Sequence, residues 1–338
     1  MKYSFTKTIK RLLFSVPIII SCLVSCKKAE NPIKYPLGTF PDSTISLSDI
    51  NSEYDDYNVD LHQLSGNLIM VFSSNRNSSG EQFDLVQGTA TFTFDQTTGA
   101  FGIGCEISHD EFLTALLDKA NTDGNDFGPY RLWSKVDGYE YLILASENSQ
   151  GNLDFYYLRN RPTGDPLPTI YGPYPATLLN TGSDDAYIAF NTEQDTAYFS
   201  SNEGGDFDIY IKTKPEETSL SDWFDDDWAA SDKVDSLNSS YEDKCPYLFR
   251  NILVFTSNRP GGLGGYDLYY SEFKNGKWNS PVNFGPGINS SSDEYRPVMT
   301  GDGYFSNRFI IFSSNRPGGK GGFDLYFRGV ETGIHTLP

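Results

Sequence analysis

The chain has 338 residues, with 26 Lys and Arg against 45 Asp and Glu, which gives a net charge of -19. This acidity argues against a nucleic-acid partner, because phosphate backbones are bound by basic surfaces. Aromatic residues make up 15% of the sequence. That share excludes a disordered acidic chain, since such chains are poor in aromatics. Length alone suggests two domains of about 150 residues, but all-β architectures of this size often form one.

The first 25 residues have the pattern of an export signal. Four basic residues within the first eleven positions precede an apolar stretch over 12–24, which is too short for a stable membrane span. The stretch ends in Leu23-Val24-Ser25-Cys26, which resembles the lipobox of bacterial lipoproteins. The resemblance implies cleavage before Cys26 and lipidation of its thiol. The alternative is a plain secretory peptide with an incidental cysteine.

We therefore expect a signal peptide over 1–25, a lipidated tether over 26–34 and one folded domain over 35–338. The expected protein is a monomeric outer-membrane lipoprotein that faces the periplasm or the cell surface. Export permits a disulfide between Cys105 and Cys245. No sequence pattern brings these cysteines together, so two buried free thiols are expected.

No cofactor or metal is expected. The three histidines, His62, His109 and His335, have no metal-ligand spacing. Residues 121–126 resemble the start of a calcium loop, but the later bidentate Glu is not in register.

A sequence repeat indicates the architecture. The stretch over 252–269, which contains Phe-Thr-Ser-Asn-Arg-Pro-Gly-Gly-Leu-Gly-Gly-Tyr-Asp-Leu-Tyr, recurs over 310–326, and weaker copies occupy 68–85, 141–157 and 197–210. A second motif, an Asn before a Ser or Thr and then an acidic residue, precedes each copy. Its Asn stands at positions 51, 121, 180, 238 and 289, at intervals of 70, 59, 58 and 51 residues. Two motifs that alternate five times indicate five repeating units.

Each unit is predicted to be a four-stranded antiparallel meander. In the last unit the first three strands are expected over 295–300, 308–313 and 323–327, where Asp324 alternates with aromatics. Such a meander cannot bury both of its faces alone, and radial repetition around a channel solves this problem. The sequence therefore predicts an all-β fold, a five-bladed β-propeller of four-stranded antiparallel blades.

One short helical insertion near 109–120 explains the longest interval between repeats. Ser108 and Glu111 have the spacing of a capping box. The stripe of Leu113, Leu117 and Ala120 is expected to pack against the blades.

The repeats resemble the WD40-like repeats of TolB-type propellers, over about residues 50–328. The resemblance implies an envelope propeller that binds protein partners and lacks a catalytic centre. We therefore expect a non-catalytic binding or scaffold module, and not an enzyme, whose partner is an envelope protein. The alternatives are a glycan-binding lipoprotein and a five-bladed glycoside hydrolase, in which carboxylates from different blades meet at the channel mouth. An aromatic platform on one face would favour a glycan.

The repeated charges are expected to be structural. A carboxylate repeated in every blade does not separate a catalytic acid from a nucleophile, and it suits a role in accepting turn N–H groups. These carboxylates are Asp55, Asp126, Asp184, Asp243 and Asp293. Three arginines open the turns after the second strands and are expected to engage carboxylates or turn carbonyls. The alternative is a ligand-binding ring of Arg76, Arg259 and Arg316.

An insertion over 216–232 has no counterpart in the other units. Its Trp223 and Phe224 are candidate ligand or partner contacts, and packing of the insertion on its own blade is the alternative. Trp228 is expected to match Trp278 as a fourth-strand residue.

The last unit lacks a fourth strand, because only residues 329–338 follow its third strand. We expect residues within 33–48 to supply that strand, so that both ends of the chain build the last blade and no open sheet edge remains.

Overall fold

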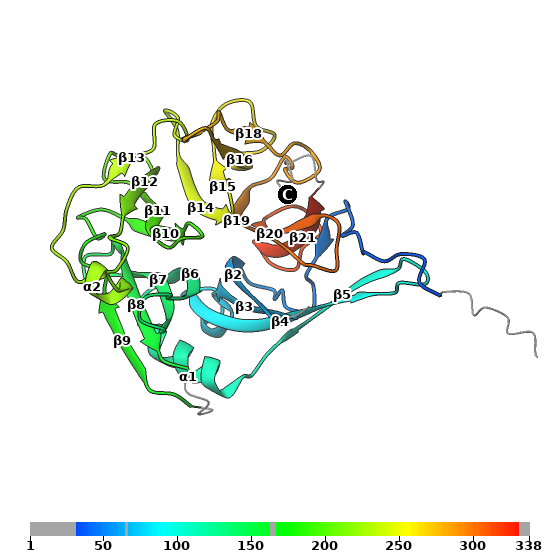
Figure 1. Cartoon of the computed structure of the whole chain (residues 1–338), viewed down its shortest axis with the longest axis horizontal. Coiled ribbons are helices and arrows are strands. Elements are labelled where there is room, and N and C mark those ends of the chain that lie inside the picture. The colour runs from blue at the N-terminus through cyan, green and yellow to red at the C-terminus, as the bar shows by residue number, and fades with distance from the viewer. Residues whose placement is uncertain (1–31, 65–66, 163–166, 331–338) are drawn as a thin grey trace, which may run out of the picture.

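The computed structural model describes residues 32–64, 67–162 and 167–330. The expected signal peptide, Cys26 and His335 lie outside these residues. Five antiparallel sheets are arranged in a ring (Figure 1). The predicted all-β, five-bladed propeller is therefore confirmed.

The blades follow one another along the chain, and each begins at the axis of the ring. Blade 1 contains β2 (Asp56–Leu64), β3 (Asn67–Ser74), β4 (Asp84–Phe94) and β5 (Phe101–Ile107). Blade 2 contains β6 (Asp126–Trp133), β7 (Glu140–Glu147), β8 (Leu153–Asn160) and β9 (Ile170–Pro175). Blade 3 contains β10 (Asp185–Phe190), β11 (Thr196–Ser201), β12 (Asp208–Thr213) and β13 (Asp232–Lys233).

The last two blades depart slightly from this pattern. Blade 4 contains β14 (Asp243–Phe249), β15 (Ile252–Ser257) and β16 (Asp267–Lys274), and its expected single fourth strand is split into β17 (Lys277–Trp278) and β18 (Val282–Asn283). Blade 5 contains β19 (Glu294–Gly301), β20 (Arg308–Ser314), β21 (Asp324–Val330) and β1 (Ile45–Ser46).

Blade 5 is closed by the N-terminal part of the described chain. In β1, Ile45 lies opposite Phe327 and Ser46 lies opposite Tyr326. The predicted closure by residues within 33–48 is confirmed. A Cβ atom on Gly329 would lie 2.4 Å from the carbonyl oxygen of Phe40, so this blade needs a glycine where the incoming chain crosses it.

The second strands form the core of each blade. All six residues of β15 are buried, as expected for a strand that is covered on both faces by neighbouring blades. Large aromatic residues fill the space between blades, and the rings of Phe155 in blade 2 and Phe199 in blade 3 meet edge to face at 5.9 Å.

The glycine-rich turns of the repeat lie against the next blade. A Cβ atom on Gly321 would lie 1.8 Å from the carbonyl oxygen of Tyr54, and one on Gly264 would lie 1.8 Å from that of Ser292. The second glycine pair of the motif therefore permits close backbone approach.

Helix α1 (Glu111–Ala120) lies beside blades 1 and 2. Asp110 caps it by accepting a 2.8 Å hydrogen bond from the N–H of Leu113, so the helix starts two residues later than the expected capping box. Its leucines, Leu113 among them, and Ala120 are buried. The structure also contains a one-turn helix η1 (Arg76–Ser78) and α2 (Leu220–Phe224) within the insertion.

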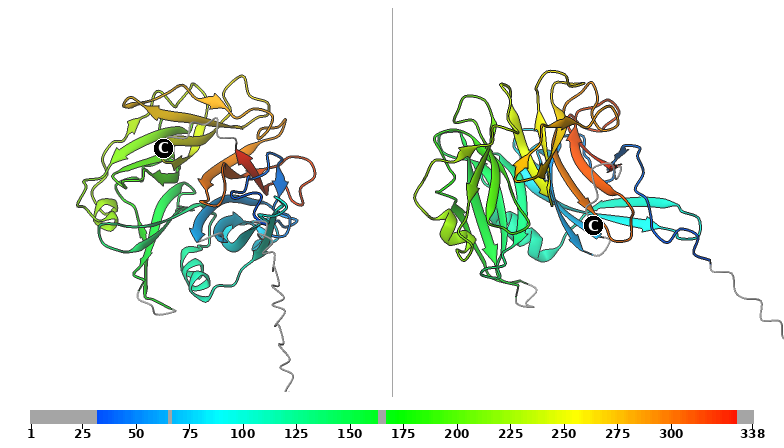
Figure 2. Two further views of the ribbon diagram at one scale, coloured as in Figure 1. Left: turned by 45° about the vertical axis from the view of Figure 1, so that its right-hand side comes forward. Right: turned by 45° about the horizontal axis from the view of Figure 1, so that its top comes forward.

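The hairpin of β4 and β5 projects from the ring (Figures 1 and 2). The chain before β1 follows this hairpin, and the N–H of Lys34 donates a 2.9 Å hydrogen bond to Gln96 at its tip. In the part of the chain that the structure describes, no helix is long and apolar enough to cross a membrane.

Candidate functional site

The five innermost strands share one backbone irregularity. In each, the third residue has a positive φ, and the pairing register shifts around it. These residues are Asn58 (φ 55°), Gly128 (57°), Tyr187 (62°), Cys245 (58°) and Arg296 (45°). A β-bulge of this kind re-aims a side chain, and here it occurs once per blade at the axis.

The re-aimed side chains fill the axial channel. The amide of Asn58 lies 3.5 Å from the hydroxyl of Tyr187, although blades 1 and 3 are not neighbours. The guanidinium of Arg296 donates to the carbonyl of Pro129 across the ring at 3.2 Å, and its carbon lies 5.6 Å from the centre of the Tyr187 ring. Contacts between non-adjacent blades are possible only near the axis. The channel is therefore plugged rather than open at this level.

The acidic residue that starts each inner strand holds the turn before it. The N–H of the residue four positions earlier donates to the carboxylate, at 2.7 Å for Asp126 and 2.6 Å for Asp243. Asp56, Asp185 and Glu294 are the equivalents in the other blades.

Three of the predicted turn carboxylates stand one position earlier and link neighbouring blades. Asp55, Asp184 and Asp293 accept hydrogen bonds of 2.7, 3.0 and 2.9 Å from the backbone N–H of Phe323, Leu153 and Tyr266.

The three predicted arginines engage these carboxylates. Arg76 pairs with Asp56, Arg259 with Asp243 and Arg316 with Glu294, and each also donates a 2.6 Å hydrogen bond to a turn carbonyl. Their side chains are only 16–17% exposed. They therefore do not form a ring of free arginines.

Blades 2 and 3 lack this arginine, since Asn148 and Glu203 take its place. Burial raises the pKa of both Asp126 and Asp185 to about 6, although the hydrogen bonds that each carboxylate accepts act to lower it. One buried oxygen of Asp185 has no hydrogen-bond partner among the described residues. These two carboxyls are held under their turns and are fully buried, so burial rather than access to a substrate explains their raised pKa. Burial also raises the pKa of Glu294, against the opposing effect of its partner Arg316.

Replacing Glu203 with Arg is expected to stabilise the protein, and the gain should grow as the pH rises from about 4 to about 6. The folded state binds the Asp185 proton more tightly than the unfolded chain, so stability is lost as the pH rises through this window. A rise of the Asp185 pKa from 3.8 to about 6 corresponds to about 3 kcal/mol at most. Melting temperatures of the wild type and Glu203→Arg at pH 4 and pH 8 measure the effect.

The matched control is Glu217→Arg, which makes the same change of charge at an exposed position in the same blade. It is expected to change both melting temperatures by a similar, small amount. If Glu203→Arg also shifts both temperatures equally, Asp185 is not the group responsible.

Half-buried aromatic residues surround the axis at the end of the channel where the inner strands begin, and we call this set the mouth ring. Three members follow the first residue of an inner strand: Tyr57, Phe127 and Tyr295. Four members precede the first residue of a third strand: Phe83, Phe207, Tyr266 and Phe323. Tyr57 touches four other members, with ring centres 5.3 Å from Phe323 and 6.1 Å from Phe127. The ring planes of the members in contact meet at 44–89°, so the mouth ring is a cluster of tilted and edge-to-face aromatics rather than one flat platform.

Two charged residues of blade 4 join the mouth ring. The ammonium of Lys244 lies 4.5 Å from the ring centre of Tyr266 and 5.3 Å from that of Tyr295, and it pairs with Glu242 at 2.6 Å. The hydroxyl of Tyr266 also donates to Glu242. Burial opposes the charge of Glu242, but the bonds from Lys244 and Tyr266 outweigh it and lower the pKa of this carboxyl. Glu242 is therefore ionised at neutral pH.

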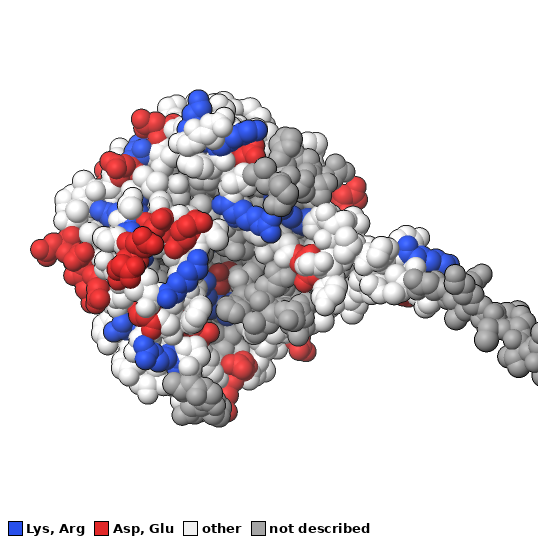
Figure 3. Space-filling view, viewed as in Figure 1, with Lys and Arg blue, Asp and Glu red and all other residues white. Residues whose placement is uncertain are grey.

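The insertion of blade 3 has a different role from the one expected. Trp223 is 2% exposed and Phe224 is fully buried, and both pack in the core between blades 2 and 3, so neither is available to a partner. Trp228 is 52% exposed and does not belong to β13, so its predicted match to the buried Trp278 is wrong. Acidic side chains gather on the side of the molecule where α2 lies (Figure 3).

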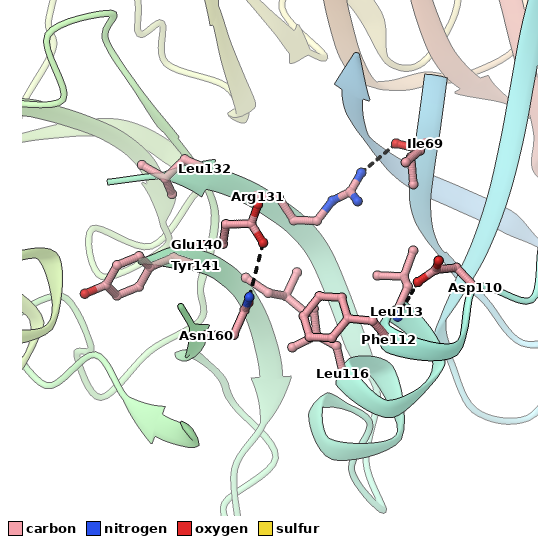
Figure 4. Close-up of a pocket in the computed structure, with 11 residues that line it drawn as sticks. Ile69, Asp110, Phe112, Leu113, Leu116, Arg131, Leu132, Glu140, Tyr141 and Asn160 are labelled. Atoms are coloured by element: carbon pink, nitrogen blue, oxygen red, sulfur yellow. Dashed lines mark hydrogen bonds between the residues drawn. The ribbon is translucent and has the colours of Figure 1, made fainter. Parts of the chain in front are cut away.

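A cavity of about 200 Å³ lies between α1 and blade 2 (Figure 4). Its wall is mainly apolar, and its polar groups are already paired. Arg131 donates to Asp60 at 2.8 Å and to the carbonyl of Ile69 at 2.6 Å, while Asn160 donates to Glu140. We interpret this cavity as imperfect packing of the helix on the blade.

Of the two thiols that were expected to be buried, Cys245 is buried and Cys105 is partly exposed. Cys105 and Cys245 are free, and burial raises the pKa of these thiols to about 12 and about 11. Among the described residues, no group of three His, Cys, Asp or Glu side chains is placed to hold a metal ion.

Solved structures of glycoside hydrolases are similar to this chain. A thermostable family-43 glycoside hydrolase aligns with a TM-score of 0.51 at 10% identity, covering 84% of this chain and 95% of its own. An endo-arabinase from Bacteroides thetaiotaomicron gives 0.51 at 12% identity, with 88% and 100% covered. A GH43_1 enzyme from Xanthomonas citri, complexed with xylotriose, gives 0.52 at 10% identity, with 87% and 92% covered.

No family model and no curated protein matches the chain. At 10–12% identity the structural matches show the fold. They are to glycoside hydrolases, so the predicted membership of the TolB-type repeat lipoproteins is wrong. The predictions of a non-catalytic module for a protein partner, and of a protein that is not an enzyme, depended on that resemblance and are overturned by the same matches.

Proposed function

We propose that the protein is a carbohydrate-active propeller that binds a glycan at the mouth ring. The observation that carries the proposal is the cluster of seven half-buried aromatic residues around the axis, next to the charged pair of Glu242 and Lys244. The structurally similar family-43 enzymes support the same class of ligand, since one of them was solved with xylotriose.

The chemistry of the mouth ring suits a sugar. A pyranose ring has apolar C–H faces and a rim of hydroxyls, so it needs flat aromatic surfaces and a few polar groups at their edge. Tyr57 and Tyr295 offer their rings, because their hydroxyls are already bonded to Tyr187 and Tyr266, respectively. Glu242 and Lys244 offer an acceptor and a donor beside these rings. A ligand here would cover the plugged channel rather than enter it.

Hydrolysis of the bound glycan is the second candidate. Glycoside hydrolases use two carboxyl groups, of which one is ionised and acts as nucleophile or base. Glu242 fits the ionised role, because it hydrogen-bonds to a mouth-ring side chain and has a lowered pKa. Asp126 has a pKa suited to an acid, but it is fully buried under its turn. Glu242 is therefore the carboxylate to test first.

The experiment is a panel of plant and host oligosaccharides, scored for binding by calorimetry and for cleavage by release of reducing ends. Tyr57→Ala is expected to weaken binding of the preferred glycan at least tenfold. The matched control is Tyr304→Ala, which removes a tyrosine that is 71% exposed and lies outside the mouth ring. Both variants are checked for folding by their melting temperatures.

The outcomes separate the two candidates. Cleavage that Glu242→Gln abolishes while binding persists supports hydrolysis. Binding without cleavage by the wild type rejects hydrolysis and leaves glycan binding in place. A wild-type protein that neither binds nor cleaves any member of the panel contradicts the proposal.

We also propose that Cys26 anchors the protein to the outer membrane by its lipid, which the Leu23-Val24-Ser25-Cys26 sequence supports. Metabolic labelling with a fatty acid is expected to mark the wild type but not Cys26→Ser. Equal labelling of both, or of neither, would reject the anchor.

A further inference from the structure

Two arginines lie over one aromatic ring at the end of the propeller opposite the mouth ring. Arg250 follows β14, and its guanidinium carbon lies 5.5 Å from the ring centre of Phe249. Arg308 begins β20 in the next blade, and its guanidinium carbon lies 4.9 Å from the same ring centre. Turns between first and second strands meet at this end, which places both charges away from the glycan site proposed above.

These charges are not neutralised within the described residues. The ion pairs found there include neither Arg250 nor Arg308. One buried nitrogen of Arg308, Nη1, has no hydrogen-bond partner. Burial lowers the pKa of Arg308, and the positive charge of Arg250 lowers it further. Within the described part of the chain, two guanidinium groups thus lie together without an ion-paired carboxylate, although the net charge of the protein is -19.

The backbone conformation of Arg250 is a second source of unfavourable free energy at this end of the propeller. Arg250 and Asn251 form the two-residue connection between β14 and β15, and Arg250 has a φ of 58°. Such connections favour Asn or Gly at this position, since other residues pay a steric penalty in the left-handed region. Strain of this kind in a non-glycine residue is concentrated at functional sites.

A groove of about 560 Å³ begins at Arg250 and runs between blades 3 and 4. Aromatic side chains line it, namely those of Tyr198, Phe273 and Trp278. Asn251 offers the oxygen of its side-chain amide, whereas the amide of Asn191 is already bonded to Asp195 and to the backbone N–H of Thr196. Glu193 lines the groove as well. Its volume and its mixture of aromatic and amide groups suit a sugar unit.

We propose that Arg250 and Arg308 bind the anionic group of an acidic saccharide, a carboxylate or a sulfate ester, whose sugar rings lie in this groove. The planar guanidinium groups match the geometry of either anion. The bound anion would neutralise the unpaired charges, and the free energy of its binding would offset the backbone strain at Arg250. This site is separate from the mouth ring and does not depend on it.

The test measures binding of three trisaccharide-sized probes by calorimetry: a uronic-acid oligomer, a sulfated oligomer and a neutral oligomer. One of the two acidic probes is expected to bind at least tenfold more tightly than the neutral one, and the tighter of the two identifies the anion. Arg250→Asn removes the charge but keeps a residue that tolerates the left-handed conformation, and Arg308→Gln removes the second charge. Each is expected to weaken binding of the acidic probe at least tenfold.

The control is Arg161→Gln, because Arg161 is an exposed arginine that also stacks on a tyrosine, at 4.8 Å from the ring centre of Tyr139. It should bind the acidic probe like the wild type. Without ligand, Arg250→Asn is expected to raise the melting temperature, whereas a purely structural arginine would lower it when replaced. Equal binding of acidic and neutral probes, or unchanged binding by Arg250→Asn, would overturn the proposal.

Discussion

Deleting residues 32–48 is expected to lower the melting temperature by more than 10 °C and to make the protein self-associate. The segment contributes β1, and Phe40 within it is 1% exposed. Phe40 packs against five rings, from a stacked contact at 3.8 Å with Phe305 to an edge contact at 5.8 Å with Phe101. Loss of one such side chain costs about 3–5 kcal/mol. Each kcal/mol lowers the melting temperature of a chain of this size by roughly 2–4 °C.

Self-association follows from the edge that the deletion uncovers. Without β1, the outer edge of β21 presents unpaired N–H and C=O groups to solvent. Calorimetry and size-exclusion chromatography measure the two effects. Phe40→Ala should reproduce most of the thermal loss without dimerisation. Leu37→Ala is the control, because Leu37 lies in the same segment but is 50% exposed. A deletion variant that melts unchanged as a monomer would show that blade 5 is stable without this strand.

The blades could be predicted because their signal is repeated. Five copies of two alternating motifs define the number of blades, and the missing fourth strand of the last copy points to the N-terminal segment. Trp278 and Trp228 show where this reasoning fails. A single tryptophan in an insertion has no equivalent in the other repeats. Whether it is buried depends on the local path of the chain, which cannot be predicted from its residue type.

The contents of the axis could not be predicted. Tyr187, Cys245 and Arg296 adopt a positive φ, which their residue types disfavour, so the sequence carries no local sign of the bulge. Part of the mouth ring corresponds to a pattern in the sequence. An aromatic residue precedes the aspartate of the third strand in four of five blades, at Phe83, Phe207, Tyr266 and Phe323. In the sequence these residues show only the alternation typical of a strand, and nothing in one sequence indicates that they converge in space.

Replacing Arg259 with Met is expected to cost about 3–5 kcal/mol at pH 8, since it leaves a buried carboxylate without its charged partner. Arg259 pairs with Asp243 and also donates to the carbonyl of Leu237 at 2.6 Å. The variant would leave Asp243 buried without a charged partner, like Asp126 and Asp185 in the two blades that lack an arginine. Their raised pKa implies that the cost falls when the carboxyl is protonated, so the loss should be clearly smaller at pH 4.

Urea unfolding at pH 4 and pH 8 measures this difference, with two comparisons that isolate its cause. The double variant Arg259→Met with Asp243→Asn should regain part of the stability at pH 8, because it removes the unpaired charge while the hydrogen bonds to Ser239 can persist. Arg161→Met, at an exposed arginine, should change stability by less than about 0.5 kcal/mol at either pH. If Arg259→Met loses the same stability at both pH values, the arginine acts through its packing on Phe255 and Tyr269 instead of through its charge.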